Sequence, residues 1–155
     1  MKTAIVYHSS HHGNTKKLLD AMAQEGEVTL LAAASNLDVD LAGYELIGFA
    51  SGTYASRLHE DVLRCAERNL PSGKPVFVVY TYGAWRPKLS NLEQIVRSKG
   101  GMLLGVYGCP GFCTFGPLKL IGGIAKGRPN AQDTAAAAAF FKEVRSRVEG
   151  KQPRG

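Results

Sequence analysis

The sequence predicts an α/β protein with three layers, in which a doubly wound, five-stranded parallel sheet lies between two layers of helices. The first observation behind this prediction is that five short apolar segments alternate with four segments of helical pattern along 155 residues. Strands joined through helices pair in parallel by right-handed crossovers, and helices then cover both faces of the sheet. The second is that three of the apolar segments end in polar, glycine-bearing loops. In such sheets, ligands bind at the carboxyl ends of the strands.

Each predicted element depends on a local pattern. Apolar runs predict strands over residues 2–8, 27–31, 44–50, 76–80 and 102–107. Helical spacing predicts helices over residues 14–24, 56–69, 89–98 and 131–148. Residues 32–42 fit no single element, and a short helix around residues 37–41 is one interpretation. The side chains expected to face the core from the first two helices are Leu18, Leu19, Met22, Leu58, Val62, Leu63 and Cys65.

The last part of the chain combines a long loop with a capped helix. Residues 109–129 contain several glycines and prolines and are predicted to form that loop. Asn130 is followed by Asp133 three residues later, a spacing that resembles a capping box at the start of the last helix. We expect one domain over residues 1–149 and a frayed tail over residues 150–155.

The segment from Ser9 to Thr15 joins the first strand to the first helix and has the chemistry of a phosphate site. Ser9, Ser10 and Thr15 offer hydroxyl donors, and Gly13 allows the backbone to approach a ligand closely. The first N–H groups of a helix have no intrahelical partner, and the helix dipole favours an anion there. The alternative is an ordinary loop in which Ser10 or Asn14 only caps the helix.

Two further loops bring aromatic side chains to the same edge of the predicted sheet. Tyr54 ends the loop after the third strand, and Tyr82 and Trp85 lie in the loop after the fourth. A ligand with an anionic tail and a flat ring system would contact all three loops at once. The sequence therefore predicts a nucleotide-like ligand at this edge.

Composition and motifs exclude several other classes. The net charge of +6 favours acidic partners or anionic ligands, but no nucleic-acid motif accompanies it. No apolar run reaches the ~18 residues that span a bilayer, and no signal peptide precedes the first strand, so we expect a cytoplasmic protein. Three cysteines do not form a disulfide framework. The spacing of a P-loop and the clustered aspartates of a receiver domain are absent from the sequence.

Two smaller groups of residues leave alternatives open. His8, His11 and His12 lie too close together in one turn to converge on a metal ion, so no metal is expected. Cys109 and Cys113 are either ordinary thiols or a redox-active pair. Residues 115–121 form an apolar segment that would cover the ligand, form a partner surface or pack as a satellite core.

The segment Ser10-His11-His12-Gly13-Asn14-Thr15 resembles the phosphate loop of the flavodoxin family, and its closing Gly-Asn-Thr is intact. Residues 111–117 and 122–130 resemble the flavodoxin-type domain that is often joined to a ferredoxin-like module, here expected to stand alone. The resemblance implies a flavodoxin-like sheet with strand order 2-1-3-4-5 and flavin mononucleotide (FMN) as the cofactor. The residues it implies at the cofactor are Ser9, Ser10, His11, His12, Gly13, Asn14, Thr15, Ser51, Gly52, Thr53, Tyr54, Thr81, Tyr82, Gly83 and Trp85.

The resemblance implies an electron-transfer protein that works with a redox partner, such as an acidic ferredoxin or a reductase. Two alternatives are an FMN-dependent NAD(P)H:quinone-type oxidoreductase and a flavin-free interaction domain on the same fold. The chain departs from the family in two respects. His12 replaces the usual threonine, and the basic net charge is opposite to the usual acidic surface.

Overall fold

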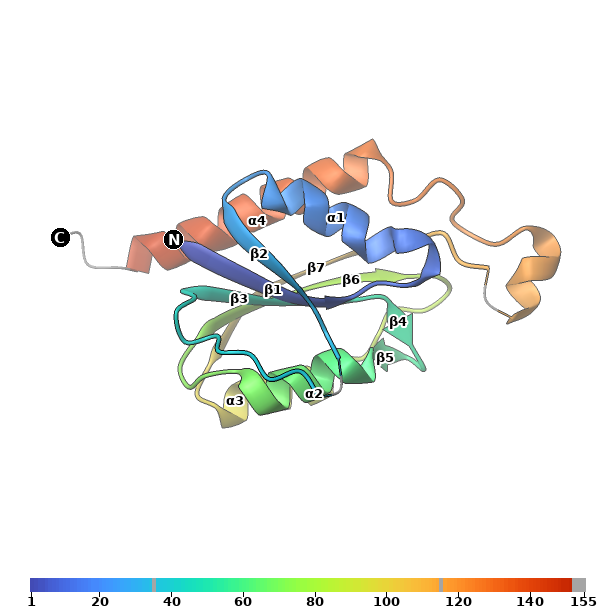
Figure 1. Cartoon of the computed structure of the whole chain (residues 1–155). Coiled ribbons are helices and arrows are strands. Elements are labelled where there is room, and N and C mark those ends of the chain that lie inside the picture. Colours follow the sequence, from blue (N-terminus) through green and yellow to red (C-terminus); the bar gives the residue numbers. More distant parts are fainter. Residues whose placement is uncertain (35, 115, 152–155) are drawn as a thin grey trace.

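The computed structural model describes residues 1–34, 36–114 and 116–151. Its strands and helices alternate along the chain, as the sequence predicts (Figure 1). The elements in chain order are β1 (Lys2–His8), η1 (His11–Gly13), α1 (Asn14–Ala23), β2 (Glu27–Ala32), β3 (Leu46–Ser51), β4 (Thr53–Tyr54), β5 (Arg57–Leu58), α2 (Glu60–Asn69), β6 (Pro75–Tyr82), α3 (Ser90–Ser98), β7 (Met102–Pro110), η2 (Gly116–Ile121) and α4 (Ala131–Lys151), where η marks 3₁₀ helices.

The main sheet has five parallel strands in the order β2-β1-β3-β6-β7. When the short antiparallel pair β4-β5 is set aside, this is the predicted order 2-1-3-4-5. Helices α1 and α4 cover one face of the sheet, and α2 and α3 cover the other (Figure 1). The predicted doubly wound, three-layer fold is therefore confirmed.

The core consists of one apolar cluster on each face of the sheet. Successive side chains of a strand point to opposite faces, so Phe77 packs with Phe141 of α4 while Val76 and Val78 pack toward α2 and α3. The predicted core residues Leu18, Leu19, Met22, Val62 and Cys65 are buried, whereas Leu63 is only half-buried. Among the described helices, none combines the length and apolar character that a bilayer span requires.

The helix predicted over residues 56–69 begins four residues late. Ala55 and Ser56 have φ values of 49° and 63°, in the left-handed region, and form the turn of the hairpin β4-β5. Such a turn matches the twist of a tight hairpin and cannot continue into a right-handed helix. Leu58 is therefore buried from a strand, and α2 starts at Glu60 with His59 as its N-cap.

The short helix considered around residues 37–41 is absent from the described part of that segment. The side chain of Asn69 binds the segment instead: its Nδ2 donates to the carbonyl of Leu37 at 2.9 Å, and its Oδ1 accepts from the N–H of Val39 at 3.2 Å. Backbone groups that a helix would pair internally are thus satisfied from α2.

The region after residue 107 differs from the predicted long loop. Strand β7 continues to Pro110, so Cys109 is buried on a strand, and residues 116–121 form η2. The predicted capping box is present at the start of α4. The N–H of Asp133 donates to Asn130 Oδ1 at 3.0 Å, and the N–H of Asn130 donates to Asp133 Oδ2 at 2.8 Å. Residues 150–151 belong to α4 rather than to the predicted tail, and residues 152–155 lie outside the described residues.

Candidate functional site

A cavity of about 630 Å³ opens at the carboxyl edge of the sheet, where β1, β3, β6 and β7 end. The three loops singled out in the sequence meet there, and residues after β7 form a fourth wall. Known ligand pockets range over about 300–1,000 Å³. The lining residues are Ser9, Ser10, Asn14, Thr15, Gly52, Thr53, Tyr54, Ala55, Ser56, Thr81, Tyr82, Gly83, Ala84, Trp85, Gly111, Phe112, Cys113, Pro117 and Leu118.

The first loop turns into α1 at Gly13, an N-cap residue that has no side chain to cap the helix. Gly13 occupies the N-cap position with a φ of 67°, and its N–H donates to the carbonyl of Ser10 at 2.7 Å. The hydroxyl of Ser9 accepts from the N–H of Lys16 at 3.2 Å. The first turn of α1 contains no acidic residue. The alternative in which Ser10 or Asn14 caps the helix is therefore not what the structure contains, and the positive end of the helix dipole faces the cavity edge without a nearby carboxylate.

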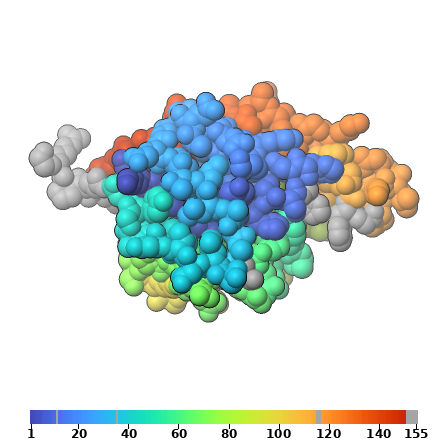
Figure 2. All heavy atoms as spheres, in the orientation of Figure 1, coloured from blue at the N-terminus to red at the C-terminus, as the bar shows by residue number. Residues whose placement is uncertain are grey.

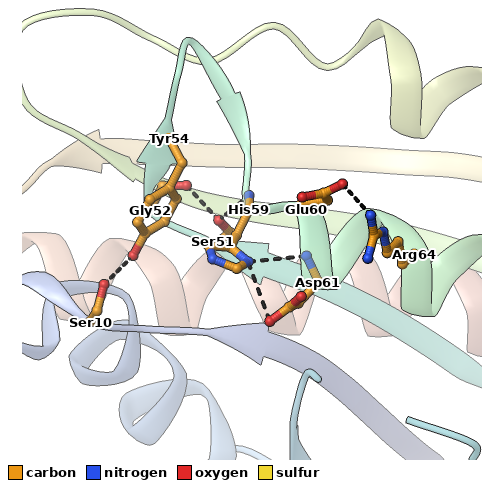
Figure 3. A network of polar contacts seen from close by, with 8 residues as sticks. All are labelled: Ser10, Ser51, Gly52, Tyr54, His59, Glu60, Asp61 and Arg64. Atoms are coloured by element: carbon orange, nitrogen blue, oxygen red, sulfur yellow. Dashed lines mark hydrogen bonds and ion pairs between the residues drawn. The ribbon is translucent and has the colours of Figure 1, made fainter. Parts of the chain in front are cut away.

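Hydroxyl groups connect the loops around the cavity. The Thr15 and Thr81 hydroxyls lie 2.9 Å apart and join the first loop to β6. Thr53 donates from Oγ1 to the carbonyl of Thr81 at 2.9 Å and joins the second loop to the same strand. The hydroxyl of Ser10 contacts that of Tyr54 across the first and second loops (Figure 3). These side-chain contacts hold the three walls at fixed distances from one another.

Asn14 connects the first loop to the fourth wall and also carries an unpaired acceptor. Its Nδ2 donates to the carbonyl of Phe112 at 2.8 Å. Gly111 allows this contact, because a Cβ at that position would lie 2.6 Å from Asn14 Nδ2. The Oδ1 atom is buried and has no hydrogen-bond partner among the described residues. Asn14 lines the cavity, but its Oδ1 is shut off from solvent, so a ligand would reach this acceptor only after a shift of the side chain or its neighbours.

Three predicted site residues, Ser51, His12 and Gly13, are not among the described lining residues. Ser51 is buried behind the second loop, where its hydroxyl accepts from the N–H of His59 at 2.9 Å and donates to the carbonyl of Gly52 (Figure 3). His12 packs on the ring of Phe112, with its Nε2 3.2 Å from the hydroxyl of Thr114. Gly13 shapes the turn from behind the lining, and the side chain of His11 lies outside the described part of the structure.

The residues that sequence reasoning missed come from the fourth wall and from the hairpin turn. Gly111, Phe112 and Cys113 follow β7, and Pro117 and Leu118 lie in η2. The sequence contains two indications of this fourth wall. The last strand ends at the same edge of the sheet as the others, and an apolar segment follows at residues 115–121. Ala55 and Ser56 gave no such signal, since neither residue type is typical of a left-handed turn.

A second cluster lies beside the second loop. The rings of His8 and His59 are stacked, with centroids 3.6 Å apart and planes 7° apart, and both contact the ring of Tyr54 edge-on. Asp61 completes a group whose possible metal-ligand atoms lie within 4.8 Å. Ring nitrogens bind metals in the ring plane, so two parallel rings present parallel lone pairs. His59 Nδ1 also accepts from the N–H of Asp61 at 3.0 Å, which leaves this geometry unsuited to a shared ion.

The cysteines near the cavity are free thiols. Burial raises the pKa of Cys109 to about 11, so this thiol is protonated and unreactive near neutral pH. Burial likewise raises the pKa of the neighbouring Tyr107 to about 12. Cys113 is half-buried and lines the cavity. In this state the two residues are separate thiols rather than a disulfide.

The loops at the carboxyl edge carry positive charge only. We define these loops as residues 9–13, 52–59, 83–89 and 111–130, and they contain no aspartate or glutamate. Arg128 forms an ion pair with Asp133 of α4 at 2.6 Å, and the side-chain hydrogen bond from Arg128 lowers the pKa of Asp133. The cations of these loops are Arg57, Arg86, Lys88, Lys119, Lys126 and Arg128.

Comparison with known proteins identifies similar sequences and structures. The family model described as a flavodoxin domain matches residues 5–98. An uncharacterised protein from Methanocaldococcus jannaschii is 34% identical over 153 residues, which cover 93% of this chain and 98% of that protein. A flavodoxin structure from the domain Archaea has a TM-score of 0.68 at 18% identity and covers 96% of this chain and 99% of its own. A Fusobacterium nucleatum flavodoxin mutant bound to FMN has a TM-score of 0.66 at 16% identity, with 95% and 97% covered.

Proposed function

The chain belongs to the flavodoxin domain family, and from that premise we propose that it binds FMN in the carboxyl-edge cavity and serves as an electron carrier. The observation that carries this proposal is the convergence of three hydroxyl-bearing loops on one cavity whose wall contains the unpaired acceptor of Asn14.

The phosphate fits the first loop. Ser9, Ser10 and Thr15 provide hydroxyl donors at the start of α1, and the first turn of that helix has no carboxylate to repel a dianion. Ser10 contacts Tyr54 in this structure, and rotation of its hydroxyl toward a phosphate would exchange that contact for a charge-assisted hydrogen bond. The positively charged loops add a favourable long-range field.

The polyol chain fits the wall between the first loop and the residues after β7. With a local shift of this wall, its hydroxyl groups would donate to the buried Oδ1 of Asn14, which has no partner among the described residues. A buried unpaired acceptor costs about 1–3 kcal/mol. A ligand that donates to this oxygen would recover that free energy, whereas an apolar ligand would not.

The flavin ring fits between the aromatic loops. Tyr54 and Tyr82 are half-buried, and Trp85 is 77% exposed although it lines the cavity. A flat ring placed against Trp85 would cover a large apolar surface that water otherwise contacts. Stacking of this kind also favours the neutral ring over a charged one, and so sets the potential of the bound cofactor.

The lining favours a carrier over a catalyst. FMN supplies one- and two-electron redox chemistry when it is bound. Among the described residues that line the cavity there is no aspartate, glutamate, histidine, lysine or arginine. Of the side chains that act as general acids or bases, the described lining therefore offers only Tyr54, Tyr82 and Cys113 beside the ring. Its residues bind and orient the cofactor and leave one edge open to a partner.

The test is a titration of the purified, flavin-free protein with FMN, followed by its visible absorption and fluorescence. We expect tight binding with quenched fluorescence. Riboflavin, which lacks the phosphate, is the matched control and should bind at least about tenfold more weakly. A protein that binds neither compound would contradict the proposal and would favour the flavin-free interaction domain.

A second assay separates the carrier from the NAD(P)H:quinone-type oxidoreductase. The FMN-loaded protein is mixed with NADH or NADPH and a soluble quinone, with and without a flavodoxin reductase. A carrier should be reduced only when the reductase is present. Turnover of the nicotinamide and quinone by the isolated protein would assign it to the oxidoreductase class instead.

A further inference from the structure

We propose that the carboxyl-edge face docks an acidic protein partner, through an apolar centre at the cavity mouth surrounded by a cationic rim. The inference rests on the proposed function, because it names the class of partner that would exchange electrons at this cavity. We define the apolar centre as Trp85, Leu120 and Ile121. We define the cationic rim as Arg57, Arg86, Lys88, Lys119 and Lys126.

The apolar centre borders the cavity and faces solvent. Trp85 is itself a lining residue, and Leu120 and Ile121 follow the lining residues Pro117 and Leu118 within η2. The exposed fractions of Trp85, Leu120 and Ile121 are 77%, 89% and 71%. Figures 1 and 2 show the segment that contains η2 projecting beyond the edge of the sheet at which β4 and β5 lie. Leu120 and Ile121 are adjacent in η2, and large apolar side chains exposed beside a cavity mark an interaction surface.

The rim is cationic, and the loops that carry it contain no aspartate or glutamate. Lys119 and Lys126 are exposed and form no ion pair among the described residues. Arg86 lies over the ring of Tyr82 at 4.9 Å and donates to the hydroxyl of Tyr80 at 3.1 Å, which holds its charge beside the mouth. A protein with carboxylates around its own redox centre would match this rim and would be steered toward it.

The combination of an apolar centre and a charged rim favours a protein over other anionic partners. Protein interfaces have this anatomy, with aromatic and aliphatic anchors surrounded by polar residues. A second copy of this chain would bring Lys119 and Lys126 against like charges. Nucleic acid is bound chiefly through its phosphates and would leave Leu120 and Ile121 without a role. Insertion into a bilayer would bury the cavity mouth in lipid and block exchange with a soluble partner.

The test is a calorimetric titration with an oxidised acidic ferredoxin, on the flavin-free and the FMN-loaded protein. The titrations are made at ionic strengths of about 0.01 M and about 0.15 M, where the Debye length is about 30 Å and about 8 Å. We expect binding at the low ionic strength that weakens at least about tenfold at the high one. Amide chemical shifts should change in residues 83–89 and 116–128.

The variants Lys119→Glu and Lys126→Glu should each weaken binding roughly three- to tenfold at low ionic strength. Lys2→Glu is the matched control, because it makes the same change of charge on an exposed residue at the opposite end of β1. It should alter the affinity less than about twofold. Leu120→Ser should weaken binding roughly three- to tenfold at both ionic strengths, since it removes apolar contact and leaves the charges unchanged.

Three results would overturn the inference. They are equal effects of Lys119→Glu and Lys2→Glu, absence of ferredoxin binding at low ionic strength, and tighter binding of duplex DNA or phosphatidylserine vesicles than of ferredoxin. The ferredoxin is oxidised and the affinity is also measured without FMN. A failure of FMN to bind would therefore refute the proposed function and leave this measurement interpretable.

Discussion

The two ends of the sheet use the same residue types for different purposes. At the amino ends of the strands, Lys74 and Lys99 are half-buried and bind backbone carbonyls. Lys74 Nζ donates to the carbonyls of Ala42 and Tyr44 at 2.9 and 2.8 Å, and Lys99 Nζ donates to that of Ala66 at 3.2 Å. At the carboxyl ends, Lys119 and Lys126 project into solvent, and hydroxyl groups make the contacts between loops.

The cations at the two ends of the sheet therefore have different roles. Some stabilise the protein's own structure, and others are available to bind a partner. Both ends are attached to the same core, so the positions of the loops are determined by the buried strands. Lys74 and Lys99 satisfy the protein's own carbonyls and are therefore unavailable to a partner. Lys119 and Lys126 form no ion pair or side-chain hydrogen bond among the described residues, which makes their charge available for binding. Substitutions at the two ends of the sheet test this division.

The largest effect is expected from Asp133→Ala, because Asp133 lies at the start of α4 and binds Arg128 of the carboxyl-edge loops. Asp133 caps α4 and binds Arg128 through two hydrogen bonds of 2.6 and 2.8 Å. Its loss should lower the free energy of unfolding by about 2–4 kcal/mol, measured by urea denaturation. The control is Asp20→Ala, which removes only an exposed ion pair with Lys16 and should lower it by about 0.5 kcal/mol or less.

The same residue gives a pH dependence with a definite sign. The hydrogen bond from Arg128 lowers the pKa of Asp133 in the folded protein below its unfolded value of 3.8. The contribution of Asp133 to stability is therefore complete above about pH 4 and is lost as the pH falls through the lowered folded-state value. The wild-type protein and Asp133→Ala should differ most near neutral pH and converge in acid. A difference that grew as the pH fell would contradict this assignment.

Lys74→Met tests the comparison directly. It leaves the carbonyls of Ala42 and Tyr44 without their charged donor and should lower the free energy of unfolding by about 1.5–3 kcal/mol. Lys119→Met, at the carboxyl end, is the matched control and should change it by less than about 0.5 kcal/mol. Similar losses in the two variants would show that the division between the two ends is wrong.

Thr15→Val tests the hydroxyl contacts around the cavity. The substitution keeps the shape of the side chain but removes the bond to Thr81 and one donor at the proposed phosphate position. We expect about tenfold weaker FMN binding and an unchanged affinity for riboflavin, measured by fluorescence quenching. Thr29→Val, on the exposed side of β2, is the control and should bind FMN like the wild type. Equal losses for both flavins would place the phosphate elsewhere.

The smallest effect is expected from Trp85→Ala. Because this side chain is mostly exposed, its removal should leave the unfolding free energy nearly unchanged. Stacking contacts of this kind contribute about 0.5–1.5 kcal/mol, so FMN and riboflavin should both bind roughly two- to tenfold more weakly. An effect on FMN alone would indicate that Trp85 acts near the phosphate rather than the ring.

The sequence was sufficient to predict the sheet because its three central strands, β1, β3 and β6, are continuous apolar runs that are buried on both faces. It also predicted the capping box, since a cap depends on residues within one turn. The hairpin at residues 53–58 was not predictable in the same way, because Ala55 and Ser56 adopt left-handed φ values that neither residue favours. Tertiary contacts around the hairpin override local preference there.

The candidate site was predictable where it follows a strand end and not where it depends on distant pairs. Asn14 was expected at the phosphate, but its bond to Phe112, 98 positions away, has no local signature. The stacking of His8 on His59 is equally non-local. The fourth wall was noted as an apolar segment, but composition alone could not distinguish a cofactor cover from a satellite core.

The unpaired Oδ1 of Asn14 has a consequence for the protein in the cell. The wall of the cavity is less stable while this acceptor is unpaired than when a ligand donates a hydrogen bond to it. If FMN binds as proposed, it therefore acts as a folding partner whose stabilisation grows with its free concentration. Flavin-starved cells would then hold more of this chain in opened forms that proteases degrade, and its abundance would follow the supply of the vitamin.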